Sequence, residues 1–200
     1  MSALELIALA SSISLLAGWR LYFVTLATGL AMRFSWIAMP EQLHGLDVLA
    51  SNWVIGIAAV GTLAEFFADK IAWVDSAWDT IHSVVRPLGG ALLSLAIVDS
   101  GDPGFQVASF LLGGGAAFVA HAGKAGARAI VNASPEPFSN VAVSTGEDIV
   151  TGGLLALAIA NPIAAAIIAS VLVGLSIWLV LSARRLLRRI LPPPVEPKAR

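Results

Sequence analysis

Four side chains that carry charge or can carry a proton recur at helical spacing in the middle of the chain. Asp75, Asp79, His82 and Arg86 follow one another at intervals of four, three and four residues, so on one helix they lie along a single stripe. An interfacial helix with a solvated face would also show a polar stripe, but such faces are usually rich in lysine. Structure and function are therefore both open interpretations of this stripe.

The first three of these residues also suggest a metal site. Asp75, Asp79 and His82 would place two carboxylates and an imidazole on one face, which suits Mg²⁺ or Mn²⁺ at a membrane surface. A metal-dependent enzyme acting on lipid headgroups or isoprenoid phosphates is the alternative that this pattern allows. Membrane transferases of that kind carry denser aspartate motifs, and no nucleophile stands out, so the sequence favours a protein that is not an enzyme.

A second acidic group, Glu147 and Asp148, precedes a short apolar run in the second half of the chain. The helix dipole favours acids at a helix N-terminus, which is a purely structural reason for them. The two acids could also pair with Arg86 or line a vestibule with it. In that hypothesis Arg86, Glu147 and Asp148 bind or gate a solute, and Asp79 and His82 form the inner mouth of an ion pathway.

Two further charged groups sit at the ends of apolar runs. Glu65 and Asp69 share one helix face, and His121, Lys124 and Arg128 share another. Ionisable groups inside a membrane protein are costly, so they are paired, face water or are functional. For Glu65, Asp69, Lys124 and Arg128 we expect a structural ion-pair network that ties the two halves of the chain together.

The composition of the chain indicates that these charged residues belong to a membrane protein. Of the 200 residues 58% are hydrophobic and only 12% are charged, with a mean hydropathy of +0.85, whereas soluble domains carry about 25% charged residues. The chain has no cysteine, which excludes disulfides and thiolate metal sites, and no cofactor is expected. A net charge of −1 gives no basic patch for nucleic acid, so the lipid bilayer is the expected partner.

The chain contains several apolar runs whose lengths are close to that of a transmembrane helix. A transmembrane helix needs about 20 such residues, and we expect six helices over 18–39, 52–67, 84–98, 105–122, 149–160 and 163–181. A further run at 4–16 either continues into the first span or forms its own helix. Pro and Gly predict turns at 39–46, 99–104 and 161–162, with longer polar connections at 69–86 and 123–148.

Basic residues predict the orientation, because Lys and Arg gather in cytoplasmic loops. Arg184, Arg185, Arg188, Arg189, Lys198 and Arg200 cluster at the C-terminus. Six spans would then place both termini in the cytoplasm. The segment 191–200 is rich in proline, and we expect it to be a disordered cytoplasmic tail.

An internal repeat is the main feature of the expected membrane domain, residues 1–190. The halves, about 51–103 and 105–162, each contain a charged helix end, a polar connection, a Gly-Gly pair that opens a short helix, and a proline turn. Gly89-Gly90 corresponds to Gly152-Gly153. The two hairpins have the same orientation, so the repeats are parallel. Short helices at matching positions of two halves indicate a transport site, although Gly-Gly also permits close helix packing.

Several motifs together resemble a known family. They are Ala17-Gly18-Trp19-Arg20, Ala68-Asp69-Lys70-Ile71, Val74-Asp75, Trp78-Asp79, Val85-Arg86-Pro87, His121-Ala-Gly-Lys124, Arg128, Asn132-Ala-Ser134-Pro135, Asn140 and Glu147-Asp148. In this combination the chain resembles the bacterial membrane family called "domain of unknown function 4126" over nearly its whole length. The resemblance implies a small polytopic protein of the bacterial cytoplasmic membrane and assigns no activity.

Three functions remain open at this point. A transporter or channel for a small solute or ion fits the paired short helices and the charged vestibule best. The metal-dependent enzyme is the second. The third is a membrane scaffold or assembly subunit in which all the charges are structural pairs. The oligomeric state is equally open, and a homo-oligomer is compatible with everything above.

Overall fold

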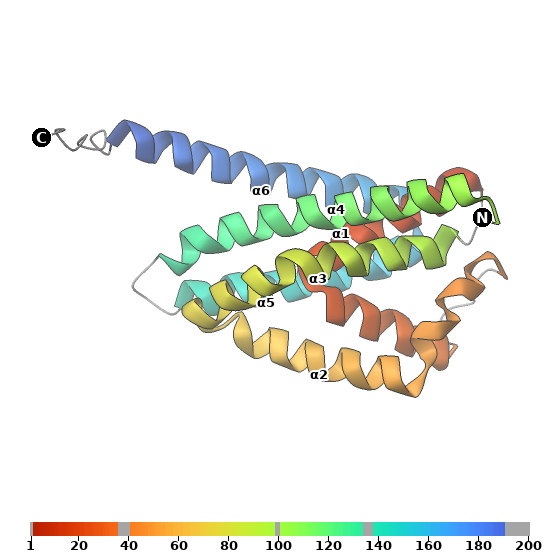
Figure 1. Ribbon diagram of the computed structural model, residues 1–200. Coiled ribbons are helices and arrows are strands. Elements are labelled where there is room, and N and C mark those ends of the chain that lie inside the picture. The colour runs from red at the N-terminus through yellow and green to blue at the C-terminus, as the bar shows by residue number, and fades with distance from the viewer. Residues whose placement is uncertain (1, 36–40, 99–100, 134–137, 191–200) are drawn as a thin grey trace, which may run out of the picture.

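The chain folds into a bundle of helices. The computed structural model describes residues 2–35, 41–98, 101–133 and 138–190, and these contain helices and no strand. The predicted tail at 191–200, Ser134-Pro135 and parts of the turns at 39–46 and 99–104 lie outside the described residues. In chain order the elements are α1 (Ala3–Arg33), the 3₁₀ helix η1 (Glu41–Ala50), α2 (Asn52–Ala68), α3 (Ala72–Val98), α4 (Pro103–Asn132), α5 (Phe138–Ala160) and α6 (Pro162–Ile190) (Figure 1).

The helices have the length and composition of membrane helices. By length and composition alone, five of them, α1 and α3 to α6, could cross a bilayer, or up to six if residues His44–Ala50 and α2, which meet at 67°, form one broken span. Large apolar side chains cover their outward surfaces, among them Trp53, Leu112 and Trp178, which are 84%, 73% and 61% exposed. These observations confirm the predicted all-α membrane fold.

Helix α1 is broken at Arg20 and folds back on itself. The backbone of Arg20 is extended, with φ −143° and ψ 69°, inside an otherwise helical segment. The two arms flank the same turn of α3, because Gly90 lies against the carbonyl of Ser14 and Gly89 against the side chain of Leu21. Both ends of α1 therefore lie at the same end of the bundle.

This folding back corrects the predicted topology. The expected first span, 18–39, is not one helix, because it contains the break. Helices α2 to α6 run in alternating directions along the bundle (Figure 1). The chain begins at one end of the bundle, and α6 finishes at the other. The sequence predicted six full spans with both termini on one side of the membrane, and this orientation stays a prediction. We call the end of the bundle at which α1 begins the N-terminal end, and the end at which α6 finishes the C-terminal end.

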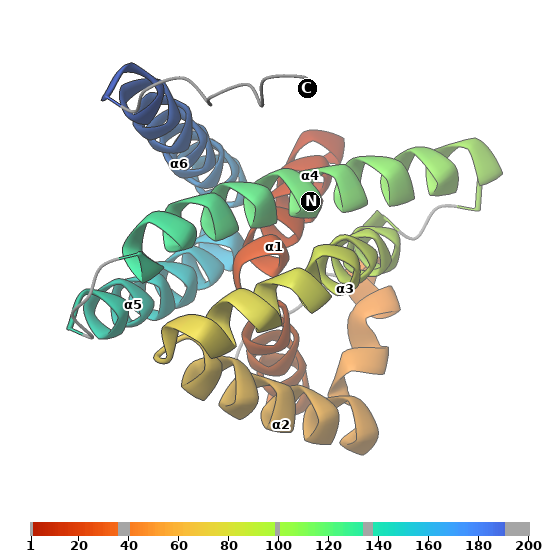
Figure 2. The same cartoon turned by 60° about the vertical axis from the view of Figure 1, so that its left-hand side comes forward.

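Helix α1 occupies the centre of the bundle. In its most apolar stretch 78% of the residues are buried, whereas the corresponding stretches of the other long helices are at most 39% buried. Figure 2 shows the other helices arranged around it. Small residues allow the close approach: a Cβ atom on Gly18 would lie only 2.3 Å from the carbonyl oxygen of Ala117 on α4.

The predicted polar connections are largely helical. Helix α3 begins at Ala72 rather than at residue 84, and Pro87 lies inside it without ending it. Helix α4 continues to Asn132, and α5 begins at Phe138. The third, fourth and fifth helices are therefore longer than predicted, and their polar turns carry the charged residues into the bundle.

The two Gly-Gly pairs lie within long helices and do not open short ones. Gly89 packs against Leu21, and a Cβ atom on Gly152 would lie 3.6 Å from the ring of Phe23. Both pairs thus contact the second arm of α1 just past the break, from α3 and from α5. The parallel internal repeat itself stays a prediction, as does the single domain over 1–190.

Candidate functional site

Arg20, at the tip of the folded-back α1, joins two other segments of the chain. Its guanidinium forms ion pairs with Asp69 after α2, with Asp148 of α5 at 3.0 Å and, at a longer 3.5 Å, with Glu147. It also donates a hydrogen bond to the carbonyl of Ser144 at 3.1 Å. The break in α1 is thus held in place by charge-assisted contacts that only an arginine fork can make together.

Lys124 of α4 satisfies the backbone at the same break. A helix that stops leaves the last carbonyls without their N–H partners. The ammonium of Lys124 donates to the carbonyl of Trp19 at 3.2 Å and to Asp69 at 3.1 Å. Burial alone would raise the pKa of Asp69, but Lys124 and Arg20 together lower it below its ordinary value.

Arg86 forms a second centre on α3. It pairs with Glu65 of α2 at 2.6 Å and with Asp79 at 2.9 Å, and its Nη1 lies 2.7 Å from Nδ1 of His121. Nε2 of His121 lies 3.1 Å from the carbonyl of Asp79. A carbonyl only accepts, so Nε2 carries the proton and Nδ1 accepts from Arg86. His121 is therefore the neutral acceptor that completes the shell of Arg86.

Arg128 of α4 forms the third centre, next to the ends of α2 and α5. It donates to Asp75 at 3.0 Å, to the carbonyl of Asn140 at 3.2 Å and to the carbonyl of Asp69. Asn132 donates to the same oxygen of Asp75 at 2.7 Å. We refer to the ten paired residues as the buried charge network: Arg20, Glu65, Asp69, Asp75, Asp79, Arg86, Lys124, Arg128, Glu147 and Asp148.

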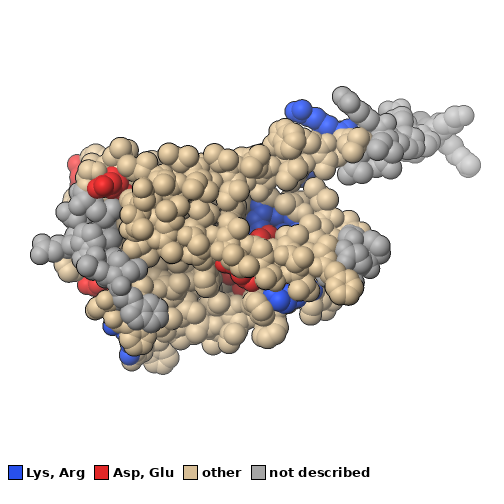
Figure 3. Space-filling view, turned by 180° about the vertical axis from the view of Figure 1, so that it is seen from behind, with Lys and Arg blue, Asp and Glu red and all other residues tan. Residues whose placement is uncertain are grey.

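Burial distinguishes two members of the network from the rest. The side chains of the other eight are at most 8% exposed, whereas Glu147 and Asp148 are 18% and 31% exposed. In Figure 3 acidic and basic side chains appear together at a hollow near the middle of one face of the molecule, and the other charged side chains of that face lie toward its two ends. The two acids of α5 are thus the most exposed part of the network.

Carboxylates outnumber cationic side chains within the network, six to four. Buried oxygens of Glu65, Asp69, Asp75 and Glu147 have no hydrogen-bond partner among the described residues, and neither does Nε of Arg20 or Nε of Arg86. Each such oxygen is costly unless water, a proton or a cation completes it. The arrangement is therefore able to accept positive charge.

A separate polar contact lies between this network and the apolar half of the bundle. Nδ1 of His82 lies 2.7 Å from the carbonyl of Trp78, so it donates, and Nε2 accepts from the hydroxyl of Tyr22 at 3.0 Å. The indole of Trp78 stacks on the imidazole of His82 at a centroid distance of 4.2 Å. These three side chains close one flank of the network.

The comparison with known proteins identifies the family of the chain. The family described as "Domain of unknown function (DUF4126)" matches residues 7–182. The chain belongs to this family. No curated protein and no solved structure matches it. The matched range includes both arms of α1 and every residue of the buried charge network, and the family supplies no activity.

The predicted pathway residues fall into two groups. Asp79 and Arg86 are paired with each other, and His82 lies on the same helix face, turned toward Tyr22. Glu147 and Asp148 pair with Arg20, so the sequence-based pairing of these acids with Arg86 is wrong. The reason is the break in α1, which inserts the Arg20 guanidinium beside α5.

The predicted structural residues are all ion-paired, although not only with one another. Glu65 pairs with Arg86, Asp69 with Arg20 and Lys124, and Arg128 with Asp75. That these pairs serve only to stabilise the structure stays a prediction.

The weaker metal hypothesis finds no support in the geometry. Asp75 faces Arg128 and Asn132, Asp79 faces Arg86, and His82 faces Tyr22. In the described part of the chain no three His, Asp or Glu side chains come together in a way that could hold a metal ion. The helical stripe that suggested the site is real, but each member has a different partner on a neighbouring helix.

Arg20 and Tyr22 are the site residues that sequence reasoning missed. In the sequence Arg20 stands out only as part of a motif that carries the family resemblance, whereas in the structure it lies 1% exposed at the centre of the network. The available signal was a single arginine within 30 otherwise mostly apolar residues. Tyr22 is the only tyrosine of the chain, and nothing in its spacing indicated a contact with His82.

Proposed function

We propose that this protein transports a small ion or solute across a membrane, with the buried charge network as its binding site. The observation that carries the proposal is the break in α1, which places Arg20 inside the bundle against Asp69, Glu147 and Asp148. Broken helices whose tips face ionisable groups near the middle of the membrane are typical of transporters.

Charge indicates the kind of solute. The two acids at the hollow would attract cations, as acidic rings do in cation channels. The network has more carboxylates than cationic side chains, and four of its buried carboxylate oxygens are without a donor. A proton or a small cation is therefore the preferred solute of this proposal.

An apolar layer supports a pathway that is closed on one side. Between the network and the N-terminal end lie buried apolar side chains of α1, α3 and α4, including Leu16, Ile97 and Ala117, each at most 1% exposed. Passage would require α1 to move relative to this layer, and the break at Arg20 provides a hinge. Entry would then be from the C-terminal end.

The same proposal includes the orientation. Arg184 and Arg185 are exposed at the C-terminal end, and basic residues favour the cytoplasmic side. We therefore place the C-terminal end, and the hollow with it, on the cytoplasmic side of the bacterial inner membrane. The N-terminal end would face the other side.

The test starts with binding and ends with flux. Purified protein in mild detergent is unfolded thermally against a panel of monovalent and divalent cations, anions and small metabolites, with Glu147→Gln and Asp148→Asn beside the wild type. Asp47→Asn is the matched control, because Asp47 is an exposed acid at the N-terminal end. A ligand at about 100 times its Kd adds about 2.7 kcal/mol of stability.

The expected result is one cation that stabilises the wild type and Asp47→Asn but not the two α5 variants. Its flux into proteoliposomes should fall in the same two variants. If no solute stabilises the wild type, none crosses the membrane, and the variants merely unfold earlier, the network is a structural scaffold and the transport proposal is wrong.

A further inference from the structure

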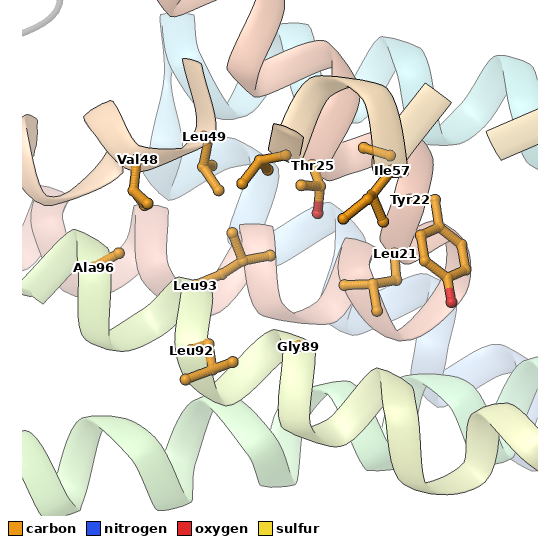
Figure 4. A pocket seen from close by; sticks show the side chains of 12 residues that line it. Leu21, Tyr22, Thr25, Val48, Leu49, Ile57, Gly89, Leu92, Leu93 and Ala96 are labelled. Atoms are coloured by element: carbon orange, nitrogen blue, oxygen red, sulfur yellow. The ribbon is translucent and has the colours of Figure 1, made fainter. Parts of the chain in front are cut away.

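A cavity lies in the N-terminal half of the bundle, away from the buried charge network. It has a volume of about 450 Å³ and is lined by the second arm of α1, by η1, and by α2 and α3. Figure 4 shows its walls, which are aliphatic except at Tyr22 and Thr25. Volumes of this size hold small ligands, and the absence of charge from the lining limits the occupant to a hydrocarbon.

The cavity opens sideways onto the surface that lipid covers. Val48, Ile57 and Leu92 line it and are also 59%, 65% and 60% exposed. Leu21 and Leu93 line it from inside and are only 7% and 5% exposed. The lining is thus continuous from the bilayer surface to the buried core, and in a bilayer it is filled by hydrocarbon rather than water.

The inner end is closed toward the buried charge network. The hydroxyl of Tyr22 is bound to His82, and its ring fits against Gly61, where a Cβ atom would lie 2.4 Å away. A chain entering the cavity therefore meets the face of an aromatic ring and does not reach the ion pairs.

The outer mouth has a cation. Arg33, exposed at the end of the same α1 arm, donates to the side-chain oxygen of Asn52. Asn52 begins α2 two residues before Val54, which lines the cavity. At 1.5 Å per residue, Arg33 lies about 12 Å along the arm from Thr25. Among the described Lys and Arg residues, Arg33 is the one at the N-terminal end. The acids Glu5, Asp47 and Asp102 lie at the same end.

We propose that this cavity binds one glycerophospholipid, with its phosphate on Arg33 and Asn52 and one acyl chain inserted toward Tyr22. The planar guanidinium matches a phosphate, and the amide nitrogen of Asn52 can donate to the same group. This site is independent of the transport proposal, because it uses no residue of the buried charge network.

Photolabelling tests the position of the acyl chain. The full chain is reconstituted in phosphatidylcholine vesicles with a trace of phosphatidylglycerol that carries a diazirine at the end of one acyl chain. After illumination the labelled residues are mapped by mass spectrometry. Label on Leu21 and Leu93 requires a chain inside the cavity, because lipid on the outer surface reaches exposed residues such as Trp178 but not these two.

Two pairs of variants give the expected changes. Ala96→Phe places a ring in the cavity and should abolish labelling of Leu21 and Leu93, while Ala156→Phe, at an exposed position of α5, should leave it unchanged. Arg33→Gln should lower the labelling by phosphatidylglycerol about tenfold through loss of a charge-assisted bond, and Arg33→Lys should retain most of it.

Three outcomes would overturn the proposal. Label on Trp178 without label on Leu21 or Leu93 would show that no chain enters, and undiminished label in Ala96→Phe would place the chain elsewhere. Equal labelling of Arg33→Gln and wild type would refute the phosphate position. Displacement of the probe by a polyprenyl phosphate at lower concentration than by unlabelled phosphatidylglycerol would refute the choice of lipid.

Discussion

At the scale of single residues, each cation of the buried charge network has acids on more than one helix or a carbonyl as a further partner. Arg86 is 0% exposed and lies between Glu65 and Asp79. A buried ion pair contributes little net stability when it forms, but the loss of one partner leaves the other charge buried and uncompensated. The network is therefore sensitive to single neutralising changes.

Arg86→Gln should be strongly destabilising for this reason. Without the guanidinium, Glu65 and Asp79 would remain buried with no counter-charge at their present distances, which costs about 3–5 kcal/mol. Thermal unfolding in detergent without added phospholipid measures the effect, and Arg33→Gln, an arginine at the exposed end of α1, should change it little. An Arg86→Gln protein that unfolds as late as wild type would mean that these pairs do not support the fold.

Asp69 should make stability depend on acid. Its pKa is lower in the folded chain than the value of about 3.9 in an unfolded one, because Lys124 and Arg20 outweigh its burial. The paired carboxylate therefore stabilises the fold above about pH 4, and that contribution is lost as the pH falls through the folded pKa. Melting temperatures of wild type between pH 7 and pH 3 should fall more steeply than those of Asp69→Asn. Equal slopes would contradict the pairing.

Sequence patterns predicted the members of the site better than their partners. Lys124 and Arg128 were placed in a network with Asp69, and Asp79 and Arg86 on one stripe, because spacing along a helix is visible in the sequence. The pairing of Glu147 and Asp148 with Arg20 was not visible, because it joins residues more than 120 positions apart through a break in a helix.

At the scale of elements, the least predictable feature is the folding back of α1. Residues 4–33 contain no proline, so the sequence left open whether the run at 4–16 continues into the first span or forms its own helix, and local propensity indicated no break at Arg20. The break depends on tertiary contacts: Asp69 and Asp148 hold Arg20, and Lys124 satisfies the carbonyl of Trp19. Pro87 shows the converse, because a residue that usually breaks helices lies within α3.

Close packing of the first arm of α1 on α4 gives a matched test. A methyl group on Gly18 would collide with the backbone of Ala117, whereas one on Gly153 meets nothing within 4 Å. Gly18→Ala should lower the free energy of unfolding by about 1–3 kcal/mol through overpacking. Gly153→Ala should leave it equal or slightly higher, because Ala favours a helix. Equal effects of the two changes would mean that α1 is not packed as closely as described.

At the scale of the whole molecule, the two ends of the bundle differ in chemistry. The buried charge network and the exposed Arg184 and Arg185 belong to the C-terminal half, whereas the N-terminal half has an apolar core and the cavity lined by Leu21 and Leu93. A transport pathway of the kind proposed would therefore be asymmetric. The buried charge network would form its polar part on one side, and movement of α1 would be needed to open the other.

The same asymmetry predicts a topology that six full spans would not give. Because both arms of α1 return to the N-terminal end, single cysteines at Leu4 and Phe34 should react with a membrane-impermeant maleimide from the same side, and one at Arg185 from the opposite side. The chain has no cysteine of its own, so each label reports one position, and Ala17→Cys, at a 0% exposed site, should react only after unfolding. Reaction of Leu4→Cys and Phe34→Cys from opposite sides would mean that α1 crosses the membrane. Arg20 would then lie on a continuous span, and the fold-back on which the transport proposal depends would be lost.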